Sequence, residues 1–249
     1  MKILLSNDDG YRAPGLMVLY EVLREFAEVV VIAPEENRSG VSNALTLRRP
    51  LTIRYDNNGF GFVNGTPADC VHLAINGMLD SVPDMVISGI NHGSNLGDDV
   101  LYSGTVAAAI EGRFLGLPAI AFSLAGSAEP YSYDTARLVA KDIFTRLMEN
   151  PLPADSILNI NIPNIPIGEL KGIESARLGA RHQSQPIIRI ESSPDDKMYQ
   201  IGPPGNEADA GPGTDFFLIG QNKVSITPLQ IDMTRHRELG RIDDWLSKR

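Results

Sequence analysis

Two adjacent carboxylates near the N-terminus are the first residues whose types suggest chemistry. Asp8 and Asp9 follow the apolar run Ile3–Leu5 and precede Gly10. Neighbouring negative charges repel each other, and a divalent cation that prefers oxygen ligands would offset the repulsion. Side chains alternate between faces along a strand, so both acids reach one ion only where the chain has turned, as Gly10 permits. The alternative is that Asp8 caps a turn and Asp9 is solvated; their place at the end of a strand favours the metal.

Neutral oxygen-bearing side chains follow later apolar runs and could complete a metal site. Ser39 and Asn43 come after the second such run, and Asn91 comes after another. Each of them alone is more typical of a turn or a helix cap. If these runs are strands of one parallel sheet, however, the residues share an edge of that sheet with Asp8. Ser39 and Asn91 are therefore candidate ligands, and Asn43 is a further possibility.

The segment around Ser103 has the features of an anion site. Ser103, Gly104 and Thr105 precede the helix-like run VAAAIEG. Ser103 or Thr105 can cap this helix, and Gly104 lets a ligand approach the backbone. The N–H groups of a first helical turn bind anions well. A plain N-cap is the alternative, but next to a metal the expected occupant is a phosphate that bridges the cation and the helix terminus.

The remaining reactive side chains carry less weight. His92 follows Asn91 and is a candidate general acid or base, although a surface loop histidine is the more ordinary interpretation. His72 is expected to pack against the core, and no carboxylate partner can be placed near His182 or His236. The single cysteine, Cys70, lacks an activating neighbour and is interpreted as buried core, which argues against a thiol nucleophile.

The order of secondary-structure signals predicts a fold that brings these residues together. Apolar, β-branched runs alternate with amphipathic segments, which predicts an α/β fold with a mostly parallel, doubly wound sheet covered by helices on both faces. In such sheets ligands bind beyond the carboxyl ends of the strands, where Asp8, Ser39 and Asn91 would lie. The expected strands are 2–6, 28–33, 84–90, 118–124 and 156–163, with a hairpin at 51–55 and 61–63 and helices from Pro14, from Pro67, from Thr105 and over 133–148.

The last third of the chain has a different character. We expect residues 1–172 to form the catalytic core and residues 173–249 a C-terminal region packed on it. The β-like runs 186–191 and 197–202 flank the turn SSPDD and indicate a hairpin arm, and 236–248 indicates a terminal helix. The arm has little core of its own and needs a surface to pack on.

Composition narrows the classes of partner. The 249 residues carry a net charge of −9, with 43% hydrophobic and 21% charged residues, as expected of a globular protein. No basic block marks a nucleic-acid surface, and no apolar run approaches the roughly 20 residues that span a bilayer. The first residues lack the features of a signal peptide, so a cytoplasmic location is expected. One cysteine excludes an internal disulfide and a cysteine metal cluster.

Several motifs in sequence order resemble a known family. NDDGYRAPG, APEENRSGVSN, GTPADCV, SGINHGSNLGDDVLYSGTVAAAIEG and ITPLQIDMT occur from residue 1 to about 235, together with RLGARHQ. This set is similar to the SurE survival protein family of metal-dependent 5′-nucleotidases. The match is weakest between Gln183 and Glu207.

The resemblance implies a fold, an activity and a set of roles. It implies a Rossmann-like three-layer α/β/α core that removes phosphate from nucleoside 5′-monophosphates, with nucleoside 3′-phosphates and short polyphosphate as further substrates. It implies homodimers or homotetramers that exchange C-terminal segments. One divalent metal ion, Mg²⁺ or Mn²⁺, would be held by Asp8, Asp9, Ser39 and Asn91. The phosphate would be bound by Asn95, Ser103, Gly104 and Thr105.

The mechanistic hypothesis has one aspartate, Asp9, taking a proton from water while Asp8 holds the ion. Two alternatives stay open, and a third is disfavoured. A phosphatase with an aspartyl nucleophile would need an acid two positions before Asp9, where Asn7 stands. A non-catalytic nucleotide-binding or phosphate-binding regulatory protein could keep the same site for sensing. A dinucleotide-dependent oxidoreductase is disfavoured, because no G-x-G-x-x-G motif follows the first strand.

Overall fold

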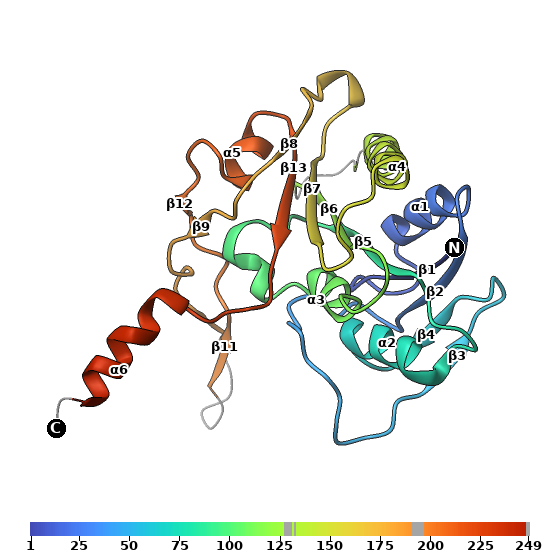
Figure 1. The fold of residues 1–249 in the computed structure, drawn as a ribbon, viewed down its shortest axis with the longest axis horizontal. Coiled ribbons are helices and arrows are strands. Elements are labelled where there is room, and N and C mark those ends of the chain that lie inside the picture. The colour runs from blue at the N-terminus through green and yellow to red at the C-terminus, as the bar shows by residue number, and fades with distance from the viewer. Residues whose placement is uncertain (127–130, 132, 191–196, 248–249) are drawn as a thin grey trace.

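A nine-stranded sheet forms the centre of the protein in the computed structural model, which describes residues 1–126, 131, 133–190 and 197–247 (Figure 1). The strand order is β3-β4-β2-β1-β5-β6-β7-β13-β8. Strands β2, β1, β5, β6 and β7 are parallel neighbours, while β3 and β13 pair antiparallel with β4 and β7. The strands are β1 Lys2–Ser6, β2 Glu28–Pro34, β3 Ile53–Tyr55, β4 Gly61–Val63, β5 Met85–His92, β6 Ala119–Ala125, β7 Ile157–Pro163, β8 Ile173–Ser175 and β13 Val224–Leu229.

Helices cover both faces of this sheet. The helices α1 (Pro14–Leu23) and α4 (Tyr133–Glu149) pack on one face and share a single apolar core with it. The helices α2 (Pro67–Leu73) and α3 (Gly104–Glu111) cover the other face. Figure 1 shows the two pairs on opposite sides of the strands. The predicted α/β architecture, with a mostly parallel sheet between two helical layers, is therefore confirmed.

Local sequence signals explain where the core helices begin. Pro14 starts α1, as a proline without an N–H can do in a first turn. Thr66 caps α2 through a capping box, since its hydroxyl accepts from the Asp69 N–H at 3.0 Å and the Asp69 carboxylate accepts from the Thr66 N–H at 2.8 Å. On α2, Cys70 is fully buried against the sheet, as predicted.

The C-terminal third extends the sheet and then leaves it. Strands β8 and β13 belong to the central sheet, so part of residues 173–249 is continuous with the core; the division at residue 172 stays a prediction. The hairpin arm is present as the antiparallel pair β10–β11, and its predicted turn at 192–196 lies outside the described residues. Further elements are β9 Ala180–Arg181, β10 Ile188–Ile190, β11 Met198–Gln200, β12 Glu207–Asp209, α5 Asp215–Gly220, α6 Leu239–Ser247, the π-helical turn Ala74–Met78, and the 3-10 turns η2 Gly97–Leu101, η3 Ile167–Glu169 and η4 His236–Glu238.

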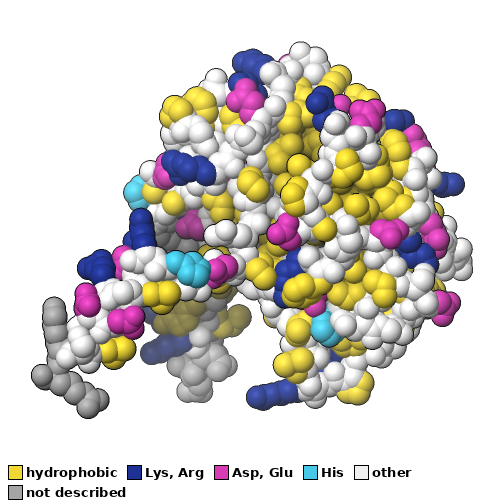
Figure 2. Space-filling view, in the orientation of Figure 1, with side chains coloured by type: hydrophobic (Ala, Val, Ile, Leu, Met, Phe, Trp, Pro, Cys, Tyr) yellow, Lys and Arg dark blue, Asp and Glu magenta, His cyan; other side chains and the backbone are white. Residues whose placement is uncertain are grey.

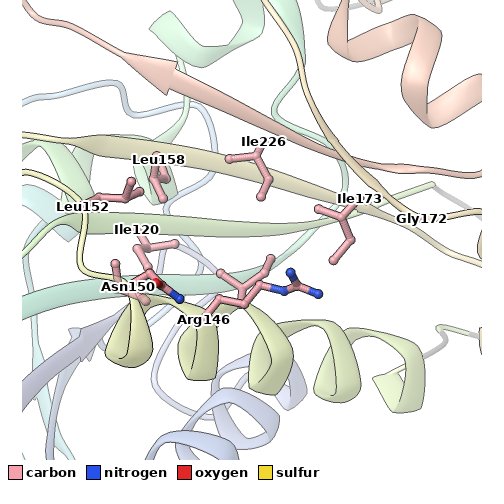
Figure 3. A pocket seen from close by; sticks show the side chains of 10 residues that line it. Ile120, Arg146, Asn150, Leu152, Leu158, Gly172, Ile173 and Ile226 are labelled. Carbon is pink, nitrogen blue, oxygen red and sulfur yellow. The ribbon is translucent and has the colours of Figure 1, made fainter.

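An apolar cavity of about 600 Å³ lies where α4 meets the sheet, and Figure 2 shows apolar side chains gathered on this face. Figure 3 shows Ile120, Leu158 and Ile226 of the strands on one side of it and Arg146 of α4 on the other. None of the predicted site residues lines this cavity. It therefore belongs to the packing of α4 rather than to the candidate chemistry.

Candidate active site

Four segments of the chain meet at the carboxyl end of the central strands. Asp8 and Asp9 follow β1, residues 37–39 follow β2, Asn91 and His92 end β5, and α3 begins at Gly104. Backbone contacts join them: the Arg38 N–H donates to the Asp8 carbonyl oxygen at 2.7 Å, and the His92 N–H donates to the Asp9 carboxylate at 2.9 Å. The segments that the sequence predicts at one edge of the sheet therefore lie in contact there.

The Asp8 side chain is buried against the first turn of α3. Its carboxylate accepts a short hydrogen bond from the Thr105 hydroxyl, and only 3% of the residue is exposed. A Cβ atom on Gly104 would lie 2.7 Å from the Asp8 Cβ, so no other residue fits at position 104 without a shift. The acid and the helix N-terminus are thus in direct contact.

The Asp9 carboxylate faces β5 and the loop after β2. One oxygen accepts from the His92 backbone, and the other lies 3.5 Å from the Asn37 amide nitrogen. The chain turns directly after Asp9, where Gly10 has a φ of +101° that favours glycine. The turn is braced by Asn7, whose amide donates to the Gly10 carbonyl oxygen at 2.9 Å. Asn37 and Asn7 were not predicted as parts of the site.

Both carboxyl groups are shifted toward their neutral forms. Burial raises the pKa of Asp8 from 3.8 to about 6, and the charge of Asp9 adds to this while the Thr105 hydrogen bond opposes it. Burial also raises the pKa of Asp9, and its contacts with His92 lower it. Ionising both acids in this position is therefore unfavourable unless positive charge is supplied nearby.

The neutral candidates lie beside the acids. Ser39 is exposed and follows Arg38, and its N–H donates to the Asn37 side-chain oxygen at 2.8 Å. The Asn91 amide nitrogen donates to the Gly93 carbonyl oxygen at 2.9 Å, which leaves its oxygen as the atom that could ligate a cation. Asn91 was expected in a loop, but pairing with β6 resumes there after a register shift, so β5 continues to His92.

The predicted phosphate residues occupy the start of α3 and the loop before it. The Ser103 hydroxyl accepts from the Val106 N–H at 3.0 Å and is the N-cap, while Gly104 and Thr105 form the first turn. Asn95 is placed differently from the other three, because its amide nitrogen donates to the Ser123 hydroxyl at 2.8 Å. Its side chain is therefore engaged with the sheet in this structure.

Asn43 lies outside the acid pair and beside the helix N-terminus. It is exposed, and with Ser103 it lines a cavity of about 620 Å³ whose other walls are mostly apolar. The adjacent Ser42 fixes this loop, since its hydroxyl donates to the Leu101 carbonyl oxygen at 2.9 Å and its N–H to the Tyr102 carbonyl oxygen at 3.1 Å. Asn43 is thus near the anion site rather than among the metal candidates.

The histidines correct part of the sequence interpretation. His92 is half-buried rather than a free surface residue: its ring stacks on Tyr131 at 4.8 Å and contacts the Tyr133 hydroxyl. His72 does not pack in the core, because its ring is on the surface and pairs with Glu111 at 2.7 Å.

His236, for which no carboxylate could be placed from sequence, pairs with Asp232 at 2.6 Å. The partners of these histidines lie far away in the sequence or in a C-terminal turn. The spacing of residue types in the sequence did not reveal them.

The donor set fits one hard divalent cation. Among the residues that the structure describes, no group of three or more His, Cys, Asp or Glu side chains could hold a metal, so a soft or histidine-rich site is not present there. Two carboxylates with neutral oxygens from Ser39 and Asn91 suit Mg²⁺ or Mn²⁺, which take oxygen ligands. A cation beside the two acids would favour their charged forms and oppose the effect of burial on both pKa values.

Comparisons with known proteins decide the family. The family model described as "Survival protein SurE" matches residues 3–185. The chain belongs to the SurE family. It is 59% identical to the 5′-nucleotidase SurE of Methylococcus capsulatus over 100% of this chain and 99% of that one, and 56% identical to the same-named protein of Nitrosococcus oceani over 100% and 98%.

A solved structure extends the SurE likeness to the whole fold. The crystal structure of the SurE protein from Aquifex aeolicus has a TM-score of 0.86, is 40% identical, and covers 99% of this chain and 100% of its own. The family resemblance and the fold inferred from sequence are therefore confirmed. Among the described residues, no helix has the length and apolar character required to cross a membrane.

Proposed function

We propose that this SurE family member is a 5′-nucleotidase, a phosphomonoesterase that converts nucleoside 5′-monophosphates to nucleoside and phosphate. The observation that carries the proposal is the contact of the buried Asp8, one of two adjacent acids, with the helix N-terminus at Gly104 and Thr105. The names of the similar SurE proteins support the same activity. A site for a cation beside a site for an anion is what phosphoryl transfer requires.

The cofactor in this proposal is one divalent ion, Mg²⁺ or Mn²⁺, on Asp8, Asp9, Ser39 and Asn91. When bound, such an ion neutralises phosphoryl charge and makes a nearby water more acidic. Asp8 is fixed by Thr105 and suits the role of a constant ligand. Asp9 is more exposed than Asp8 and suits the removal of a proton from water. Phosphate oxygens would be held by the side chain of Ser103 and the N–H groups of Gly104 and Thr105.

The nucleoside part of the substrate would occupy the cavity of about 620 Å³ beside the helix N-terminus. Ser103 and Asn43 stand at its polar side, and apolar residues such as Val106 and Ile231 line the rest. An apolar cavity of this size next to an anion site suits an organic phosphomonoester with a ring system better than inorganic polyphosphate. Activity on nucleoside 3′-phosphates and short polyphosphate is kept as a secondary proposal.

A panel of substrates tests the proposal directly. Phosphate release is measured from 5′- and 3′-mononucleotides and from short polyphosphate, with Mg²⁺ or Mn²⁺ and with a chelator. We expect release from 5′-nucleotides that the chelator abolishes and that added metal restores. Binding of nucleotide without phosphate release would favour a regulatory protein instead. A trapped phosphoenzyme would favour an aspartyl nucleophile.

Assembly and location complete the proposal. Exposed apolar side chains on the arm, such as Ile188 and Tyr199, and on α6, such as Ile242 and Trp245, support a homodimer or homotetramer built through the C-terminal segments. The net charge of −9 argues against nucleic acid as the main ligand. We keep a cytoplasmic location as part of the proposal.

A further inference from the structure

The loop that connects the two halves of the candidate site is held from the C-terminal third of the chain. This loop, residues 93–103, runs from the β5 end to the cap of α3. Its 3-10 turn η2 lies against β9, and Figure 1 shows this green turn beside the orange β9. The position of Ser103 relative to Asn91 therefore depends on what anchors the loop.

The Asp215 carboxylate is the central anchor. Asp215 begins α5 and is fully buried. One oxygen accepts from the Gly97 N–H at 2.7 Å, and the other accepts from the Gly179 N–H at 2.8 Å and the Phe216 N–H at 2.9 Å. A single acid thus ties the loop, the β9 segment and α5 together.

Side chains of two strands hold the loop at Asn95. The Asn161 side chain of β7 accepts from the Asn95 N–H at 2.8 Å and donates to the Asn95 carbonyl oxygen at 3.0 Å. Asn159 donates to the same carbonyl oxygen at 2.7 Å, and the Ser123 hydroxyl of β6 accepts from the Asn95 amide. Asn159 and Asn161 thus bind the loop backbone at Asn95, and Ser123 binds the Asn95 side chain.

The surroundings leave the loop little freedom. Gly97 has a φ of +56°, and a Cβ there would lie 2.6 Å from the Phe216 ring. Asp99 pairs with Arg181 at 2.7 Å, and the Arg181 guanidinium lies over Phe216 at 4.9 Å. The backbone at Gly97 and the start of α5 are therefore packed closely against each other.

We infer that Asp215 is a positioning residue that sets the 93–103 loop, and through it Ser103, against Asp8 and Asp9. This inference rests on the proposed function. Asp215 touches neither the acids nor the predicted phosphate residues; it acts through the Gly97 backbone. Asn161 and Ser123 support the same loop at Asn95. The site is thus completed by residues from both ends of the chain.

The test compares Asp215→Asn with Asp209→Asn. Asn keeps the shape of the side chain but replaces one acceptor oxygen with a donor, which leaves an N–H of Gly97, Gly179 or Phe216 unpaired. Asp209 is a matched control, because it is an acid of the same region whose exposed carboxylate pairs with Arg177. We expect Asp215→Asn to lower kcat/KM for adenosine 5′-monophosphate and the affinity for inorganic phosphate by about tenfold or more. The preference among different nucleoside 5′-monophosphates should not change, and Asp209→Asn should behave as wild type.

Amide hydrogen exchange separates this inference from the proposed function. In Asp215→Asn, peptides covering residues 93–103 should exchange at least about tenfold faster, whether or not the protein hydrolyses nucleotides. A folded Asp215→Asn protein with unchanged exchange and unchanged phosphate affinity would overturn the inference. If that variant does not fold, Ser123→Ala removes one support of Asn95 and should weaken phosphate binding severalfold; unchanged binding there overturns it equally. An inactive wild type with a loop that loosens in Asp215→Asn would refute only the 5′-nucleotidase.

Discussion

Asp8 is a buried acid whose charged form is disfavoured by its surroundings. It is almost fully buried, it lies beside another acid, and its pKa is raised to about 6. A residue chosen only for stability would not be ionisable here. A carboxylate at this position is explained by the cation that it could bind. Removing its charge should therefore lower activity and raise the stability of the metal-free protein.

The first prediction concerns turnover. Asp8→Asn keeps the side-chain shape and an oxygen that can accept from the Thr105 hydroxyl, but it removes the negative charge. We expect metal-dependent phosphate release to fall by at least about 100-fold while the circular dichroism spectrum is unchanged. Unchanged turnover in this variant would remove Asp8 from the mechanism.

The second prediction concerns pH and metal-free stability. Because the folded pKa of Asp8 is about 6 and its ordinary value is 3.8, the folded state binds more protons between these values, and the free energy of unfolding falls as pH rises through them. The loss is about 3 kcal/mol above pH 6. With chelator present, Asp8→Asn should therefore unfold at a higher temperature than wild type at pH 8 and show no gain below about pH 4. A gain that does not depend on pH would contradict this explanation.

At the scale of elements, the start of α3 must approach β1 closely. Gly104 allows this approach, and Thr105 uses it to bond Asp8. Asp8 and Thr105 are 97 residues apart in the sequence. The contact between α3 and β1 therefore follows from the order of strands in the sheet and not from local sequence. The helix cap could be predicted, and its acid partner could not.

The third prediction tests the close contact between α3 and β1 with the substitution Gly104→Ala. The added methyl group meets the Asp8 Cβ at 2.7 Å, so helix or strand must move, at a cost of about 1–3 kcal/mol. We expect kcat/KM to fall by about tenfold or more and the melting temperature to drop. Gly116→Ala is the control, because nothing lies within 4 Å of its Cβ position, and it should change stability by less than about 0.5 kcal/mol.

Sequence patterns predicted the elements better than the contacts between them. The spacing of apolar residues and the positions of proline and glycine placed the parallel strands and the helix starts. This was possible because burial and capping depend on local sequence. The alternation of Asn159 and Asn161 with isoleucines in SILNINIP was a signal for a buried polar face that was not interpreted. The role inferred for Asp215 depends on contacts across more than a hundred residues, which no spacing rule indicates.

At the scale of the whole molecule, exposed apolar side chains lie on a helix that projects from the core. The α6 helix extends away from the sheet in Figure 1, and its side chains Ile242 and Trp245 are more than half exposed. Exposed apolar residues on a projecting helix are typical of segments that pack on another copy.

The fourth prediction follows from this surface. Light scattering of the wild type should give a mass of two or four times 27.1 kDa. The double substitution Ile242→Asp and Trp245→Asp should shift the protein toward smaller species, because two charges cannot be buried in an apolar contact without a large cost. A wild type that stays monomeric at micromolar concentration would refute the proposed assembly.

The burial of Cys70 has a practical consequence. Its thiol is fully enclosed between α2 and the sheet, and its pKa is raised by burial, so it offers neither access nor thiolate to a maleimide. The native protein should therefore not react with thiol-directed labels. A cysteine introduced into the 93–103 loop or on α6 would be the only reactive one, and a fluorophore or spin label there would report on loop order or subunit exchange without any background to remove.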